Sequence, residues 1–176
     1  MNFKEIAVNR QSCRNYDPNK YIEDEKLQAI LSCAALAPSA CNSQPYNIFV
    51  CRNDKAKSAA KATQGMGMNK FTDNADVIIV ISEGQYTTTA ALGAKLKNND
   101  YRSIDIGILS SYITAEATAQ GLGSCILGWF DEKELQKICD TKDRIRLAIS
   151  LGYANEDEIL RNKKRKELNT FVKFID

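Results

Sequence analysis

Two short basic segments, far apart in the chain, carry the side chains best suited to binding an anion. Arg10-Gln11-Ser12-Cys13-Arg14 offers two guanidinium groups and a hydroxyl, and each arginine can donate parallel N–H bonds to a phosphate. The second segment is Lys163-Lys164-Arg165-Lys166. Taken alone, the first is also typical of a solvated helix end, and the second of a solvated basic loop or a weak nucleic-acid patch.

A third segment combines small polar side chains with two prolines, in Pro38-Ser39-Ala40-Cys41-Asn42-Ser43-Gln44-Pro45. Small side chains let a flat ligand approach the backbone, and hydroxyl and amide groups can hydrogen-bond to its edge. Proline, serine and asparagine are equally expected in an ordinary connection between a helix and a strand. The segment is therefore a candidate binding platform, with a plain connecting loop as the alternative.

A fourth segment, Gly121-Leu122-Gly123-Ser124-Cys125-Ile126-Leu127-Gly128, is rich in glycine but is not a dinucleotide-binding fingerprint. That fingerprint places its glycines between a strand and a following helix, whereas these follow a predicted helix and lead into a predicted strand. A tight turn accounts for Gly121 and Gly123. Gly128 would weaken a strand over 124–129 unless a ligand or another backbone must come close.

The composition excludes several kinds of chemistry. The chain has no histidine, which removes Ser–His and Cys–His nucleophile pairs and imidazole metal ligands, and we expect no metal site. Its six cysteines include no C-x-x-C pair, so we expect reduced thiols that lie mostly in the core. The chemistry is therefore expected to belong to a bound cofactor.

Length and charge indicate one compact unit, which we place at residues 1–176. A net charge of +2 argues against a broad nucleic-acid-binding surface. No apolar run reaches the roughly 18 residues that span a membrane, and the N-terminus lacks the pattern of a signal peptide. We therefore expect a cytoplasmic protein without a membrane or nucleic-acid partner.

Alternating helices and strands are expected to position these segments. Apolar residues at three- and four-residue spacing predict a helix over 24–36, and an unbroken β-branched run predicts a central strand at 77–81. The form of 84–100 is not predicted, and an apolar tail from Leu168 is expected to dock on another surface. Further helices are expected over 3–9, 54–64, about 101–120 and from 131, and further strands over 47–51, 124–129 and 144–151.

The order of these motifs resembles the nitroreductase family of FMN-dependent oxidoreductases over nearly the whole chain. The order is R-x-S-x-R, A-P-S-A-x-N-x-Q-P, D-I-G within a long helix, G-L-G-S-C, L-G-Y and K-x-R-K. The resemblance implies an α+β fold with a central mixed β-sheet flanked by helices. It also implies an interleaved homodimer in which a C-terminal segment reaches across and both chains build each FMN site.

The resemblance assigns most candidate residues to FMN. Arg10 and Ser12 would hold the FMN tail, and Lys163 and Arg165 would complete the phosphate site, because a phosphate monoester carries about 1.5 to 2 negative charges at neutral pH. Arg14 would lie near the pyrimidine edge of the ring. The partner subunit would contribute the platform against the ring, from Pro38, Ser39, Ala40 and Asn42.

Two further residues are assigned to the flavin ring. Lys70 stands about where the family often has a ring-contacting lysine, although the asparagine that flanks it in the family pattern is missing, with Gly67 in its place. The main-chain N–H near Gly128 would reach the reactive edge of the flavin. Arg14, and with it Lys70, would stabilise the negative charge of reduced flavin.

The implied activity is electron transfer from transiently bound NAD(P)H through FMN to a small acceptor, in a ping-pong cycle. The acceptors implied by the family are nitroaromatics, quinones, enones or free flavin. An FMN-binding carrier or sensor with little turnover is the alternative. A nucleic-acid-binding protein that uses Lys163-Lys164-Arg165-Lys166 ranks last, because the acidic Asn155-Glu156-Asp157-Glu158 lies just upstream.

Overall fold

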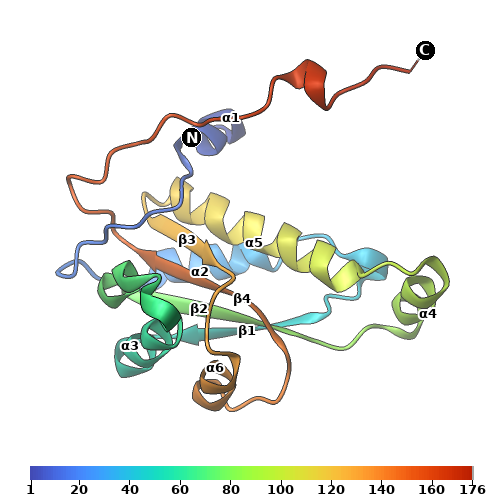
Figure 1. Cartoon of the computed structure of the whole chain (residues 1–176), viewed down its shortest axis with the longest axis horizontal. Helices are drawn as coiled ribbons and strands as arrows, with labels where there is room; N and C mark the ends of the chain where they lie inside the picture. Colours follow the sequence, from blue (N-terminus) through green and yellow to red (C-terminus); the bar gives the residue numbers. More distant parts are fainter. Residues whose placement is uncertain (176) are drawn as a thin grey trace.

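The computed structural model describes residues 1–175, and its centre is a four-stranded sheet (Figure 1). The strand order is β1-β2-β4-β3, and each neighbouring pair is antiparallel. The strands are β1 (Tyr46–Cys51), β2 (Val77–Glu83), β3 (Gly123–Leu127) and β4 (Ile145–Gly152). The helices are α1 (Phe3–Asn9), α2 (Asp24–Ala34), α3 (Asn53–Ala62), α4 (Thr88–Lys97), α5 (Tyr101–Ala119) and α6 (Glu132–Ile138), with short 3-10 helices η1 (Ala40–Asn42), η2 (Gly65–Gly67), η3 (Lys70–Asn74) and η4 (Leu168–Thr170).

The expectation of a mixed sheet needs a correction for the strands that the structure describes. Parallel pairing among residues 1–175 is limited to one bridge, between Ser12 and Ser124 on the outer edge of β3. The chain leaves this edge at once, because Tyr16 already bridges Ala154 in the antiparallel sense. The α+β class with helices on both faces is confirmed, but the segment after α1 contacts this edge through a single bridge and so adds no parallel strand.

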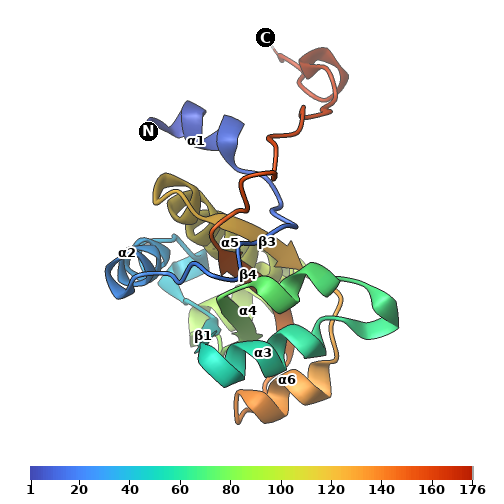
Figure 2. The same ribbon diagram turned by 90° about the vertical axis from the view of Figure 1, so that its left-hand side faces the viewer.

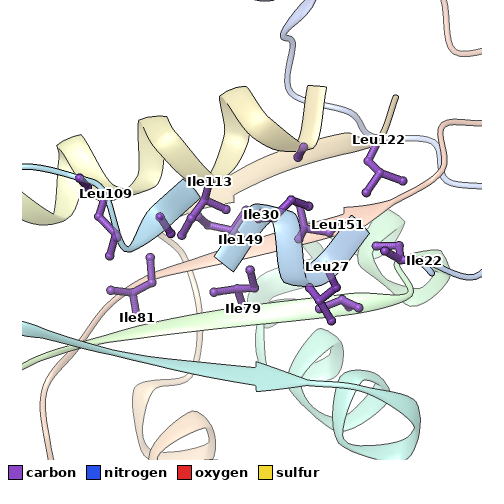
Figure 3. Close-up of a cluster of buried hydrophobic side chains, with 14 of the residues drawn as sticks. Ile22, Leu27, Ile30, Ile79, Ile81, Leu109, Ile113, Leu122, Ile149 and Leu151 are labelled. Atoms are coloured by element: carbon purple, nitrogen blue, oxygen red, sulfur yellow. The ribbon is translucent and has the colours of Figure 1, made fainter. Parts of the chain in front are cut away.

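The two faces of the sheet carry separate hydrophobic clusters (Figures 2 and 3). On one face, Ile79 and Ile149 pack with residues of α2 and α5, including Ile30 and Ile113. On the other face, Ile78 and its neighbours pack with residues of α3 and α6. The predicted strand at 77–81 is confirmed, and its unbroken apolar run follows from helices covering both faces.

The long helix α5 lies over one face of the sheet and extends from one end of the molecule toward the other (Figure 1). Its start is capped by the Asp100 side chain, which accepts from the Ser103 N–H, and its end is followed by Gly121 at φ +77°. The prediction of a helix over about 101–120 is therefore confirmed. The region 84–100, which the pattern did not resolve, contains α4, capped by the Thr87 side chain.

The two ends of the chain lie on the same side of the molecule (Figures 1 and 2). Beyond β4 the chain is extended, and its apolar tail is exposed, with Phe174 and Ile175 at 88% and 89% of their full accessible area. The expected docking of this tail therefore does not occur on its own sheet. Within residues 1–175, no helix has the length and apolar character to cross a membrane.

Candidate functional site

The two basic segments, about 150 residues apart in sequence, line one cleft, which we call the basic cleft. Residues of the segment after α1 form one wall, and residues of the extended chain beyond β4 form the other. Figures 1 and 2 show these two segments of the chain side by side. Its volume is about 300 Å³. It is lined by Arg10, Gln11, Ser12, Arg14, Arg161, Asn162, Lys163, Lys164 and Arg165.

Hydrogen bonds fasten the two walls of the basic cleft to each other. The Gln11 side chain donates to the Ile159 carbonyl and accepts from the Arg161 N–H, both at 3.0 Å. Lys163 Nζ donates to the Val8 carbonyl at 2.6 Å, and the Arg161 guanidinium donates to the Ser12 carbonyl. These bonds give the extended C-terminal segment a fixed position beside Ser12, so the cations converge.

The positive charge of the basic cleft is largely unmatched by the chain itself. Arg161 pairs with Glu158 at 2.9 Å, whereas among residues 1–175 no carboxylate forms an ion pair with Arg10, Arg14 or the cations at 163–165. Partial burial and the neighbouring arginines lower the pKa of Lys163. Such mutual repulsion would be relieved by a bound anion.

The edge of β3 continues from the basic cleft. The Cys13 N–H donates to the Ser124 carbonyl at 2.9 Å, and this close approach requires Gly123, where a Cβ atom would lie 2.7 Å from the Cys13 sulfur. The Ser124 hydroxyl oxygen is buried and has no hydrogen-bond partner among the described residues. Gly121 is therefore needed for the turn after α5, as expected, whereas Gly123 is needed for the close contact with Cys13.

Gly128 lies one residue beyond β3 rather than inside it, which corrects the predicted strand over 124–129. A Cβ atom added to Gly128 would meet nothing within 4 Å, so open space lies beside this backbone. At about 3.3 Å per residue, Gly128 lies roughly 13 Å along the edge from Ser124. The edge of β3 therefore runs from the basic cleft to Gly128, whose backbone is exposed.

Lys70 lies near this far end of β3. Asn69, directly before it, donates to the Trp129 carbonyl at 3.4 Å, and the Trp129 indole donates to the Gly65 carbonyl at 3.1 Å. Lys70 itself is the exposed first residue of η3. The structure therefore brings the Lys70 loop and the Gly128 segment together, at the opposite end of the β3 edge from the basic cleft.

The predicted platform lies elsewhere in the same chain. The Ala40 N–H donates to Asp105 Oδ1 at 3.0 Å, near the start of α5, whereas Ser12 adjoins the chain just after the end of α5. At 1.5 Å per residue, Asp105 and Ala119 are roughly 20 Å apart along that helix. Pro38, Ser39, Ala40 and Asn42 therefore do not line the basic cleft of their own chain.

The platform loop, residues 38–44, has a strained backbone that is held in place by hydrogen bonds. Cys41, Asn42 and Gln44 all have positive φ, near 50°, a conformation that costs energy for residues other than glycine. The Ser39 hydroxyl accepts from the Gln44 N–H at 2.9 Å, and the Ser43 hydroxyl accepts from the Thr87 N–H at 2.8 Å. Strain of this kind persists where the surroundings enforce it, often at ligand sites.

Sequence reasoning missed two residues of this arrangement, Arg161 and Asp105. Arg161 stands two residues before the basic run and could have been counted with it. Asp105 is 2% exposed, one of its oxygens binds Ala40, and the other is buried without a partner among the described residues. A carboxylate inside an apolar helix pattern was the available signal.

Comparisons of the sequence and the fold with known proteins point to one family. The sequence model described as Nitroreductase family matches residues 7–68 and 57–153. A Haemophilus influenzae protein that carries the provisional name NAD(P)H nitroreductase is 26% identical over 212 residues, covering 97% of this chain and 95% of the relative. The solved structure of an FMN-dependent nitroreductase from Clostridium difficile R20291 has a TM-score of 0.75 and 27% identity, covering 97% and 98% of the two chains.

A second solved structure is similar in fold. It is a provisionally named nitroreductase from Exiguobacterium sibiricum 255-15 in complex with FMN, with a TM-score of 0.80, 20% identity and coverage of 99% and 98%. The family match includes Arg10, Ser12, the platform loop and all four strands. The chain therefore belongs to the nitroreductase family.

Proposed function

We propose that the protein is an FMN-dependent oxidoreductase that takes electrons from NAD(P)H and delivers them to a small oxidised acceptor. The observation that carries this proposal is the basic cleft, where several cations converge without carboxylate partners among residues 1–175. Family membership supports it, and the relatives described above are named as NAD(P)H or FMN-dependent nitroreductases. We further propose that residues 1–176 act as one FMN-binding unit.

The basic cleft would hold the FMN phosphate. Arg10, Lys163 and Arg165 would neutralise its charge, and Ser12 would add a hydroxyl donor. Arg161 would act differently, because its guanidinium already binds Glu158 and the Ser12 carbonyl and so fixes the walls of the cleft. The buried Ser124 hydroxyl, which lacks a partner among the described residues, adds a polar group nearby.

The edge of β3 would contribute residues beside the flavin ring. Bound FMN would supply two-electron chemistry between NAD(P)H and the acceptor. Arg14, at the near end, and Lys70, at the far end, would stabilise negative charge on the reduced ring. The open space at Gly128 would let a main-chain N–H approach the ring. Neither role requires a histidine.

We propose that a second copy of the chain completes the site. The platform residues Pro38, Ser39, Ala40 and Asn42 lie at the far end of α5 from their own basic cleft, so a partner subunit would supply them to the ring. The exposed apolar tail that follows the basic cleft, with Leu168, Phe171, Val172, Phe174 and Ile175, supports such a homodimer.

We propose that NAD(P)H and the acceptor use one binding position in turn, which is a ping-pong cycle. Nitroaromatics, quinones, enones and free flavin are the proposed acceptors, because all are small electron-poor molecules that can stack on a flat ring.

An absorption spectrum of the purified protein, followed by anaerobic addition of NADH and then NADPH, tests this function. We expect flavin bands that bleach with one or both donors and return when a nitroaromatic or a quinone is added. Flavin bands that resist both donors would contradict the enzyme and favour an FMN carrier or sensor. A protein that neither contains nor takes up FMN would contradict both.

A further inference from the structure

A pair of cysteines lies on the opposite face of the sheet from α2 and α5. Cys51 is the last residue of β1, two residues before the start of α3, and Cys139 caps the end of α6. Both belong to the hydrophobic cluster between the sheet and these two helices, where Cys51 is buried and Cys139 is half-buried. Neither residue has a part in the proposed FMN site.

The packing of α3 and α6 brings the two thiols together. The Asp131 N–H, at the start of α6, donates to the carbonyl of Ala62, the last residue of α3, at 2.7 Å. The two helices also pack side by side along their length. Because the start of α6 meets the end of α3, the helices run in opposite directions, and the end of α6 lies near the start of α3. Cys139 therefore lies beside Cys51, within one apolar cluster.

The two thiols interact electrostatically, and they do so unequally. The Cys139 thiol lowers the pKa of Cys51 by more than burial raises it, and Lys55 adds to this lowering. The Cys51 thiol, together with burial, raises the pKa of Cys139. Of the two thiols, Cys51 is therefore the one that we expect to attack an oxidant, with Cys139 as the resolving thiol.

The other four cysteines lack this arrangement. Burial raises the pKa of Cys13 to about 11, and burial also raises the pKa of Cys125 and Cys33. Cys41 is exposed in the platform loop. Since thiolate character controls oxidation, Cys51, whose pKa is lowered, is distinguished from Cys13, Cys125 and Cys33 by chemistry as well as by position.

We propose that Cys51 and Cys139 form a reversible intrachain disulfide when the protein meets a hydroperoxide such as hydrogen peroxide. The Cys51 sulfur attacks the peroxide, an S–O bond forms, the O–O bond breaks and water leaves. The Cys139 sulfur then attacks the Cys51 sulfenic acid, an S–S bond forms, the S–O bond breaks and a second water leaves. In sum, two thiols lose two protons and two electrons, and the peroxide becomes two waters.

The disulfide would tie the end of β1 to the end of α6 across the long stretch of chain that includes α3, β2, α4, α5 and β3. A crosslink that closes so long a loop restricts the unfolded chain strongly, so we expect the midpoint of thermal unfolding to rise by roughly 5–10 °C. The bond would stabilise the α3 and α6 face without touching the basic cleft, so FMN binding should be unchanged.

The test treats the FMN-free protein and the FMN-loaded protein with a small excess of hydrogen peroxide, followed by alkylation, digestion and mass spectrometry without reductant. We expect two of the six thiols to escape alkylation, a linked peptide that joins Cys51 to Cys139, and recovery of both thiols with dithiothreitol. The variant Cys33→Ser keeps the pair and is the matched control, with the same yield of linked peptide.

Single variants of the pair sharpen the result. Cys139→Ser should stop the disulfide and leave a sulfenic acid on Cys51 that dimedone traps, while Cys51→Ser should form no linked peptide. Circular dichroism confirms that both variants are folded. A treated wild-type protein without the Cys51–Cys139 peptide, or with a disulfide between other cysteines instead, would overturn the proposal, and so would an absence of dimedone product in Cys139→Ser. None of these readouts depends on flavin activity.

Discussion

Two clusters of cations, near the two ends of α5, differ in how their charge is matched. Near the start of α5, Arg102 and Arg146 both bind the Glu83 carboxylate at 2.6 Å, and Arg146 also lies 3.6 Å from Asp100. Near the end of α5, the basic cleft holds more cations, yet Arg161 alone has a carboxylate partner among residues 1–175. In the first cluster both arginines have carboxylate partners, whereas the second cluster lacks negative charge.

The environments of the two clusters agree with this difference. The Glu83 side chain is 18% exposed, and Arg102 lies over the Tyr86 ring at 4.3 Å, so the paired cluster is largely enclosed. In the basic cleft, Arg14 and Arg165 are exposed. A cation that serves the fold is usually paired where it is buried, and a group of unpaired cations around one cleft is typical of an anion site. The number of charges in the sequence does not distinguish structural cations from anion-binding cations, but the ion pairs in the structure do.

The largest expected effect comes from removing charge from the basic cleft. In the double variant Arg10→Ala, Arg165→Ala, we expect the Kd for FMN to rise on the order of 100-fold or more, because each charge-assisted hydrogen bond contributes about 1.5–3 kcal/mol. Fluorescence titration measures the Kd. The control Arg144→Ala removes an exposed arginine outside the cleft and should change nothing.

The same double variant should unfold without flavin at nearly the wild-type urea midpoint, within about 0.5 kcal/mol, because no ion pair of the described chain is broken. A loss of stability as large as the loss of FMN affinity would show that these arginines serve the fold, and the contrast between the clusters would then be invalid.

Breaking the ion pairs of Glu83 should lower the stability of the protein and leave FMN binding unchanged, which is the opposite of the result expected for the basic cleft. Glu83→Gln leaves Arg102 and Arg146 without a carboxylate in an enclosed site, so we expect the free energy of unfolding to fall by about 1–3 kcal/mol while the Kd for FMN stays constant. Urea unfolding measures the loss. The control Glu134→Gln, which breaks the exposed pair with Lys137, should cost less than about 0.5 kcal/mol.

The effect of Glu83 should also depend on pH. Burial raises the pKa of Glu83, but hydrogen bonds from Arg146 and Arg102 outweigh burial and hold the pKa below its ordinary value. The stabilisation is therefore present above the unfolded pKa of about 4.3 and is lost as the pH falls through the lower folded value. The stability difference between wild type and Glu83→Gln should shrink below pH 4, and a difference that grows there would contradict the pairing.

Asp105 lies near the start of α5 and is an intermediate case, because one of its carboxylate oxygens is satisfied and the other is not. Asp105→Ala removes the acceptor for the Ala40 N–H, so we expect amide hydrogen exchange in residues 38–44 to accelerate roughly 5- to 30-fold, which corresponds to about 1–2 kcal/mol. Asp105→Asn keeps an acceptor oxygen and should exchange at nearly the wild-type rate. Equal exchange in wild type and Asp105→Ala would show that Asp105 does not hold the loop.

The smallest expected effect is the pH dependence of FMN binding through Lys163. Partial burial, Arg10, Arg165 and Arg161 lower its pKa, so its charge is lost at a lower pH than that of an ordinary lysine. We expect FMN affinity to weaken as the pH rises through this range, by on the order of 3- to 10-fold. In Lys163→Gln this step should be absent, and an unchanged pH profile would remove Lys163 from the phosphate site.

Local patterns in the sequence predicted much of the fold. The β-branched run at 77–81 predicted β2, the apolar spacing over 24–36 predicted α2, and glycine predicted the turn after α5, because each depends on neighbours in the chain. The two basic segments and the platform loop were also found from residue types. Their assignment to FMN came from the family resemblance and remains a prediction.

Tertiary contacts decided what the sequence could not predict. The Glu83 cluster joins residues from β2, α5 and β4, so no local pattern identifies Arg102 and Arg146 as paired arginines. Gly123 is required by Cys13, which is more than 100 residues away. The separation of the platform loop from the basic cleft depends on α5, because the two sites lie near opposite ends of that helix, and the sequence did not predict this arrangement.

The most direct test of the central claim, that the unpaired cations of the basic cleft bind a phosphate, compares two flavins that differ in that group. The Kd values of FMN and riboflavin for the flavin-free protein should be measured under identical conditions. We predict that FMN binds at least about 100-fold more tightly, and that this ratio collapses in the double variant Arg10→Ala, Arg165→Ala. Equal affinity of the wild-type protein for FMN and riboflavin would contradict the claim.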